Sequence, residues 1–295
     1  MVVTPGESGL RLQVEAALGA LESWLARGRR GPVALTVEAA PPEVSSPDLA
    51  GVDGVVASYS TSVAGTRNRR HNVALAAKAL DGVTVKPGAV FSYNRVVGPR
   101  TTEAGYKTAP VIIRGELVPG IGGGACQVSS TLYNAALLAN MRVVRRSHHS
   151  HPIGYVPAGR DATVVYEMID LRLGNPSPHP LVFQTRLAGR RLTVMVLGKR
   201  GGAPVRVFSS RSAVSAGPPM MREDPTLAPG VQVMERPAQE GVRARVVRVI
   251  GEGEAAREEV VSSDFYRPSR AIVRVGPSAP GEPAPAAPPA VTPPQ

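Results

Sequence analysis

The chain has 295 residues, of which 43% are hydrophobic and 4% aromatic, and its net charge is +11. This length suffices for one large domain or for two to three small ones. The single cysteine, Cys126, excludes an internal disulfide and a cysteine-rich metal site. No run of about 18 apolar residues occurs, so the sequence predicts no membrane span.

The first two thirds of the chain read as strands interrupted by a few helices, which predicts an α+β fold of mixed, mainly antiparallel β-structure. Leucines at helical spacing predict a helix over 8–27, and residues 33–37 alternate like a strand. Two alternating runs, 181–187 and 191–197, meet at Gly189 and are typical of a β-hairpin. Further helices are predicted over 69–80 and 127–140, and further strands over 55–60, 89–93, 109–113, 115–118 and 142–146.

The last third differs in composition. From Gly198 to Pro229 the sequence is rich in Gly, Ser, Pro and Arg, which predicts a domain boundary. Beyond it, strands are predicted over 242–250, 257–262 and 271–275, which would form a small all-β module. Residues 277–295 are Pro/Ala-rich and predict a disordered or polyproline-like tail.

The stretch from Gly120 to Tyr133 contains Cys126, preceded by a run of glycines and followed by a helical pattern. We expect Cys126 at a helix N-terminus, where free N–H groups and the helix dipole favour an anion. A thiol placed there can have a pKa of roughly 3.5 to 7.5 instead of about 8.5. The alternative is a small buried thiol that fills a gap in the core, and the residues alone favour the two interpretations about equally.

A cysteine nucleophile needs an imidazole within hydrogen-bonding reach and a group that orients the imidazole. His148, His149 and His151 cluster just after the predicted Cys126 helix, and Asp161 and Asp170 are candidate orienting residues. The residues alone leave open which histidine faces the sulfur. The cluster could also hold a metal, but no carboxylate pattern completes such a site, so we predict neither a metal nor a cofactor.

Other candidate residues give weaker signals. Arg100 and Lys107 could contact an anionic group of a substrate, although each is also an ordinary surface residue. The glycines before Cys126 are not a phosphate-binding loop, because no Gly-Lys-Ser/Thr follows them.

Several segments in the middle of the chain share a pattern with a known family. They are Phe91–Asn94, Val97–Thr101, Gly105–Tyr106, Gly122–Ala136, His149–Ser150 and Tyr155–Val164, with Asp170 and Asn175. On these segments the chain, over roughly residues 55–200, resembles the VanW family. Residues 205–276, which end in Tyr266–Gly276, are similar to the G-five module of extracellular wall proteins, in a looser match.

Some members of that family are implicated as L,D-transpeptidases of peptidoglycan. The resemblance implies that Cys126 attacks a stem-peptide carbonyl, with His149 as acid/base residue and Asp161 behind it. Backbone N–H groups of Gly123, Gly124 or Gln127 would stabilise the oxyanion. Ser129, Tyr155 and Arg100 complete the expected oxyanion and substrate-binding set.

The resemblance also implies a domain organisation and a location. Family members are exported or membrane-anchored, yet residues 1–6 lack a basic start and an apolar centre, so we expect a truncated or misassigned start and an extracytoplasmic or wall-associated protein. The expected divisions are 1–50 (the end of a wall-associated, peptidoglycan-binding-like region), 51–200 (VanW-like domain), 201–276 (G-five-like β module) and 277–295 (tail).

Three functions fit these expectations: a cysteine acyltransferase on wall peptides, a non-catalytic module that binds glycan or stem peptide and is linked to glycopeptide resistance, and a rigid scaffold. Only the first needs a thiolate. The positive charge suits anionic wall polymers better than nucleic acid, because the few aromatics lie at motif positions rather than on a basic face.

Overall fold

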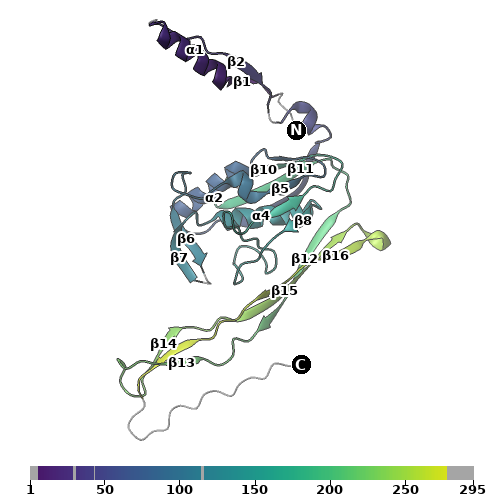
Figure 1. Cartoon of the computed structure of the whole chain (residues 1–295). Helices are drawn as coiled ribbons and strands as arrows, with labels where there is room; N and C mark the ends of the chain where they lie inside the picture. The colour runs from purple at the N-terminus through teal and green to yellow at the C-terminus, as the bar shows by residue number, and fades with distance from the viewer. Residues whose placement is uncertain (1–5, 29–30, 43, 114–115, 278–295) are drawn as a thin grey trace.

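The computed structural model describes residues 6–28, 31–42, 44–113 and 116–277. Figure 1 shows a small N-terminal unit, a central domain and a long, narrow β-module one after another. In the N-terminal unit, β1 (Gly9–Leu12) pairs antiparallel with β2 (Val37–Ala40), and α1 (Val14–Ala26) lies between them in sequence. The helix expected over 8–27 is therefore wrong in its first turn, and the strand expected over 33–37 lies at 37–40, because pairing of β1 with β2 extends both segments.

The central domain is organised around an antiparallel sheet with the strand order β3-β11-β10-β4. Helices α2 and α4 pack on this sheet, α4 against β3 and β11 and α2 against β10. The predicted hairpin is confirmed as β10 and β11, which pair from Val182 with Leu197 to Ala188 with Arg191. The bounds are β3 (Gly54–Ser62), α2 (Arg67–Leu80), β4 (Thr84–Val85), α4 (Ala125–Leu138), β10 (Leu181–Ala188) and β11 (Arg191–Gly198).

Two smaller sheets complete the domain, with orders β5-β9-β8 and β6-β7. The short helix α3 was not predicted; it begins where the Ser92 hydroxyl accepts a hydrogen bond from Arg95 N. A 3-10 helix, Ser46–Leu49, precedes the domain. The bounds are β5 (Val90–Ser92), α3 (Tyr93–Val97), β6 (Thr108–Ile113), β7 (Glu116–Ile121), β8 (Arg142–Arg145) and β9 (Arg172–Gly174).

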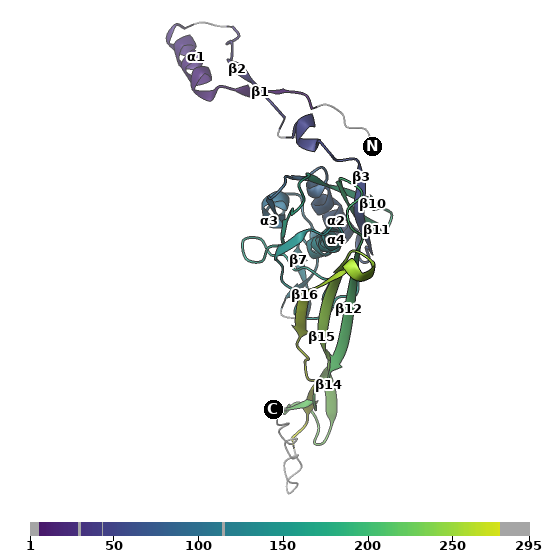
Figure 2. The same cartoon turned by 90° about the vertical axis from the view of Figure 1, so that its right-hand side faces the viewer.

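The C-terminal module consists of two three-stranded sheets, β12-β15-β16 and β13-β17-β14. The three predicted strands are confirmed as β15, β16 and β17. Strand β12 lies within the segment 198–229, which was predicted as a domain boundary. Figure 2 shows the first of these sheets reaching the central domain. Beyond residue 277 the expected tail lies outside the described residues. The bounds are β12 (Val205–Val214), β13 (Met220–Glu223), β14 (Gln232–Arg236), β15 (Gly241–Ile250), a 3-10 turn (Gly253–Ala255), β16 (Arg257–Tyr266) and β17 (Ile272–Val275).

Every residue of helix α4 from 127 to 137 is buried, including those with polar side chains. Those side chains hydrogen-bond to neighbouring segments: Thr131 Oγ1 lies 2.8 Å from Thr61 Oγ1 on β3, and Asn134 Nδ2 donates to Arg160 O at 2.7 Å. The helix is thus fixed both to the sheet and to the loop that carries Asp161. None of the helices in the described part of the chain is long and apolar enough to cross a membrane.

Candidate active site

The glycines before Cys126 allow the chain to pass between α2 and β6 into helix α4. A Cβ at Gly123 would lie 2.4 Å from Pro110 O, and one at Gly124 would lie 2.9 Å from a methyl carbon of Val73. Gly124, the N-cap of α4, has φ of 115°, in the left-handed region that favours glycine. Glycine at these positions therefore sets where the helix begins.

Two buried side chains hold this loop, and sequence patterns did not single them out for that role. Asn72 Nδ2 donates to Lys107 O at 2.8 Å and to Gly123 O at 3.0 Å, while its Oδ1 accepts from Lys107 N at 2.8 Å. The Tyr93 hydroxyl donates to Ala125 O at 3.1 Å. The approach to Cys126 is therefore fixed by hydrogen bonds as well as by close packing.

Cys126 is the second residue of α4, so the prediction of a helix N-terminus is confirmed. Its side chain is partly exposed. The sulfur lies 3.5 Å from both Val164 O and Val164 N, beside the loop after Asp161. The sulfur therefore lies beside a backbone N–H that can stabilise its anion.

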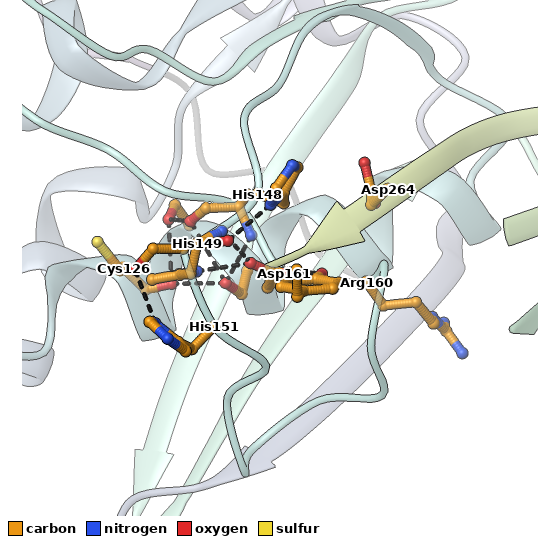
Figure 3. A network of polar contacts seen from close by, with 12 residues as sticks. Cys126, His148, His149, His151, Arg160, Asp161 and Asp264 are labelled. Carbon is orange, nitrogen blue, oxygen red and sulfur yellow. Dashed lines mark hydrogen bonds and ion pairs between the residues drawn. The ribbon is translucent and has the colours of Figure 1, made fainter. Parts of the chain in front are cut away.

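His149 and Asp161 form a buried pair next to the sulfur. His149 Nδ1 lies 2.6 Å from Asp161 Oδ2, which also accepts from His149 N at 2.7 Å. This leaves Nε2 as the ring nitrogen available to the Cys126 thiol, and the imidazole and the thiol shift each other's pKa. Figure 3 shows His149 between Cys126 and Asp161. A thiol, an imidazole and a carboxylate thus follow one another in space, which is the arrangement that cysteine catalysis requires.

The electrostatics of the group favour a thiolate–imidazolium pair. Burial alone would raise the pKa of Cys126, but the hydrogen bond and charge of His149, the Val164 N–H and the charge of Arg100 together lower it. Burial opposes protonation of His149, yet Asp161 and Cys126 raise its pKa to about 9. The pKa of Asp161 falls to about 2 despite burial, because His149, Arg146 and Tyr266 bind its carboxylate.

The remaining residues of the histidine cluster, and Asp170, lie elsewhere. His148 Nδ1 contacts His149 O at 2.6 Å, and its ring packs on Tyr266 with centroids 4.8 Å apart. His151 Nδ1 lies 3.2 Å from Ser150 Oγ. Asp170 accepts from Ser92 Oγ and Asn94 N. Among the described residues, no group of three or more His, Cys, Asp and Glu is placed to hold a metal ion.

Two arginines and a tyrosine surround the thiol. Arg100 donates to Asn94 Oδ1 and Gly98 O, each at 2.9 Å, and its charge acts on Cys126. Arg69, which no sequence pattern singled out, interacts electrostatically with both Cys126 and Tyr155. Burial and the Cys126 charge raise the pKa of Tyr155 far above its usual range, so it remains a phenol. Arg69 and Arg100 thus place positive charge near enough to the thiol to act on it.

Gln127 and Ser129, which we expected near the oxyanion or substrate, point into the protein. Gln127 N donates to Gly124 O at 3.0 Å, and its Nε2 donates to Thr61 Oγ1 and Ser62 O. Ser129 Oγ donates to Ala162 O at 2.7 Å. Both side chains anchor α4 to its neighbours.

Comparison with known proteins matches the two parts of the chain that bear on this site. Residues 68–197 match the family described as VanW like protein, and residues 219–278 match the G5 domain. The chain contains a VanW-like domain followed by a G5 domain. Cys126, His149 and Asp161 all lie in the VanW-like domain, whereas Tyr266 lies in the G5 domain.

Two curated proteins are similar to parts of this chain. The chain is 37% identical to the uncharacterized protein YoaR of Bacillus subtilis over 198 residues, 65% of this chain and 64% of the relative. It is 34% identical to the vancomycin B-type resistance protein VanW of Enterococcus faecalis over 113 residues, 37% of this chain and 41% of the relative. The chain therefore spans less than two thirds of the length of each.

The solved structure of an IgA1 protease G5 domain matches 28% of this chain and 100% of its own length, at 21% identity and a TM-score of 0.22.

Proposed function

We propose that the protein is a cysteine-dependent acyltransferase that acts on stem peptides of the cell wall. The observation that carries this proposal is the buried His149–Asp161 pair beside Cys126: His149 Nδ1 lies 2.6 Å from Asp161 Oδ2, and the imidazole lowers the pKa of the thiol. A structural thiol would need neither an imidazolium nor a buried carboxylate beside it. Burial of charged groups carries a desolvation penalty, and buried groups with strongly shifted pKa values cluster at functional sites.

The geometry supports a two-step transfer. The Cys126 thiolate attacks the carbonyl carbon between an L-centre and a D-centre, and the leaving amine takes the proton from His149 Nε2 as the thioester forms. The amine of a second stem peptide then attacks the thioester, His149 accepts its proton, and the Cys126 thiolate is released. Asp161 keeps the imidazole in one orientation through both steps, because it binds Nδ1 and the backbone N–H of the same residue.

Arg69 and Arg100 support a substrate that carries a carboxylate. Both lie near enough to the thiol for their charges to act on it. A stem peptide that ends in a D-amino acid has its free carboxylate one residue beyond the bond that is cut. In this proposal the two guanidinium groups hold that carboxylate, and Tyr155 borders the same surface.

The second domain supports a location at the wall. A VanW-like domain joined to a G5 domain points to a cell-wall-associated protein. The relative named for vancomycin resistance also points to the cell wall. The net charge of +11 suits anionic wall polymers. The alternative function is non-catalytic wall binding, which the G5 domain alone could provide and which requires no thiolate at Cys126.

The test uses a purified disaccharide-tetrapeptide ending in D-alanine, incubated with the full chain and followed by mass spectrometry. We expect release of D-alanine and formation of cross-linked dimers. Cys126→Ala should abolish both while leaving sedimentation with purified walls unchanged. Turnover that survives in Cys126→Ala would refute the proposal, and a wild-type protein that binds walls without releasing D-alanine would favour the binding function.

A further inference from the structure

The carboxylate that orients His149 is itself held by the C-terminal module. Asp161 Oδ2 faces the histidine, whereas Oδ1 accepts hydrogen bonds from the Tyr266 hydroxyl and from Arg146 Nη2, the latter at 3.0 Å. Tyr266 is the last residue of β16, 105 positions after Asp161, and its side chain is fully buried. One oxygen of the same carboxylate therefore serves the imidazole, and the other is bound by a residue of another domain.

Arg146 links a second residue of β16 to the same carboxylate. Its Nη1 lies 2.5 Å from Asp264 Oδ2, and its Nε donates to Asp161 O at 2.6 Å. The side chains of both Arg146 and Asp264 are at most 8% exposed. A buried ion pair of this kind is costly to break, because each partner would be left as an uncompensated charge. Figure 3 shows Asp264 on β16 close to the group around Asp161.

The loop that ends at Asp161 is fitted closely against the module. Gly159 has φ of 83°, and a Cβ there would lie 2.7 Å from a methyl carbon of Val246 on β15. Gly159 N donates to the Tyr266 hydroxyl at 2.8 Å, and Ser209 Oγ on β12 donates to Ala158 O at 2.5 Å. The module therefore fixes both the backbone and the carboxylate of this segment.

The hydroxyl of Tyr266 has a defined polarity in this arrangement. Because it accepts from the amide of Gly159, its own proton is directed to Asp161. The ring of His148 packs against the same tyrosine, at a centroid distance of 4.8 Å. Tyr266 thus contacts the segment before His149 and the segment that holds Asp161.

We propose that Tyr266 is a positioning residue for the His149–Asp161 pair, and that Asp264 acts in the same way through Arg146, so that the C-terminal module is part of the catalytic apparatus. This proposal depends on the function proposed above. Without the Tyr266 hydroxyl, Asp161 would lose a donor on Oδ1 and could rotate away from Nδ1, which would destabilise the imidazolium and, with it, the Cys126 thiolate.

The test compares Tyr266→Phe with the matched control Ser209→Ala, in the full chain. Tyr266→Phe removes the hydrogen bonds of the hydroxyl with Asp161 and with Gly159 N. Ser209→Ala removes only the hydrogen bond to Ala158 O in the same loop, so only the first change removes a contact with Asp161. The primary measurement is the rate of iodoacetamide labelling of Cys126 from pH 5 to pH 10, which needs no substrate. The second is the turnover of the disaccharide-tetrapeptide, with kcat and KM determined separately.

We expect Tyr266→Phe to raise the apparent pKa of the thiol by about half a unit, which is about a threefold loss of labelling rate at pH values below that pKa. Its kcat should fall about tenfold with KM unchanged, as loss of a hydrogen bond to a charged group would predict. Ser209→Ala should match the wild type in both measurements.

If the wild-type thiol has a lowered pKa and Tyr266→Phe leaves both the labelling profile and kcat unchanged, the positioning role is refuted while the acyl-transfer proposal stands. A wild-type thiol pKa at or above about 8.5 refutes both proposals. Should Tyr266→Phe fail to fold, Asp264→Asn takes its place: a lower kcat at unchanged KM supports the proposal, and an unchanged kcat overturns it.

Discussion

Replacing Asp161 by Asn is the most direct test of the electrostatics at this site. Asparagine has nearly the same size and retains an oxygen that can accept from His149 Nδ1, but it removes the negative charge. Asp161 is 1% exposed, so no solvent compensates for the change. The perturbation therefore removes the charge next to the imidazole with little change in volume. It also replaces Oδ1, which accepts from Tyr266 and Arg146, with an amide group that only donates.

The expected magnitude follows from the pKa of His149. It is raised from 6.5 to about 9 although burial opposes protonation, and Asp161 gives the largest contribution that raises it. A shift of 2.5 units corresponds to about 3 kcal/mol in favour of the imidazolium. In Asp161→Asn we expect a pKa of 6.5 or lower. At pH 7.5 the protonated fraction of His149 then falls from roughly 97% to about 9% or less, and the Cys126 thiolate that depends on it falls at least tenfold.

The assay is carboxamidomethylation of Cys126, followed by mass spectrometry across pH. Since Cys126 is the only cysteine in the chain, every labelled molecule reports on this thiol. Asp224→Asn is the matched control, because Asp224 is another buried aspartate that binds a hydroxyl and an arginine, Thr226 and Arg274, at the far end of the module. An Asp161→Asn profile that coincides with that of the wild type would refute the account of thiol activation given above.

Three further predictions concern the loop, the titration and the substrate. Gly123→Ala should lower the free energy of unfolding in urea by about 2 kcal/mol or more, because the new Cβ would lie 2.4 Å from a backbone oxygen of β6, whereas Gly202→Ala, with nothing within 4 Å, should have little effect. In a Cys126→Ser background, the stability advantage of His149 over His149→Gln should be complete below pH 6.5 and decline as the pH rises toward the raised pKa of His149; an advantage that grows with pH would contradict this sign. Arg69→Gln should raise KM for the tetrapeptide about tenfold and leave KM for a substrate amidated at its C-terminus unchanged, and equal effects on both substrates would exclude carboxylate recognition.

Local patterns predicted the bend and the helix that carry Cys126. The glycines before Cys126 and the periodicity after it indicated a bend followed by a helix, and alternation indicated the hairpin at 181–197. These features depend on residues that are close together in the sequence, so the local pattern of apolar residues is enough to predict them. The sequence also placed His149 and Asp161 among the candidates, although their pairing became visible only in three dimensions.

The features that the sequence did not reveal depend on contacts between distant segments. Residues 9–12 are a strand because they pair with residues 37–40, despite their helical spacing. β12 lies in a segment rich in Ser and Arg, and its strand conformation comes from its ladder with β15. Tyr266 gave no local signal of its role, because its partner is more than one hundred positions away.

Gly159 bears on how such proteins could change over evolution. Because a side chain there would collide with Val246, the loop and strand β15 are fitted to each other across the boundary between two domains. A G5 domain exchanged for an unrelated one would therefore have to bring a compatible surface for this loop, or leave Asp161 without its supports. The two domains would be inherited as a matched pair, and substitutions along their seam should occur together.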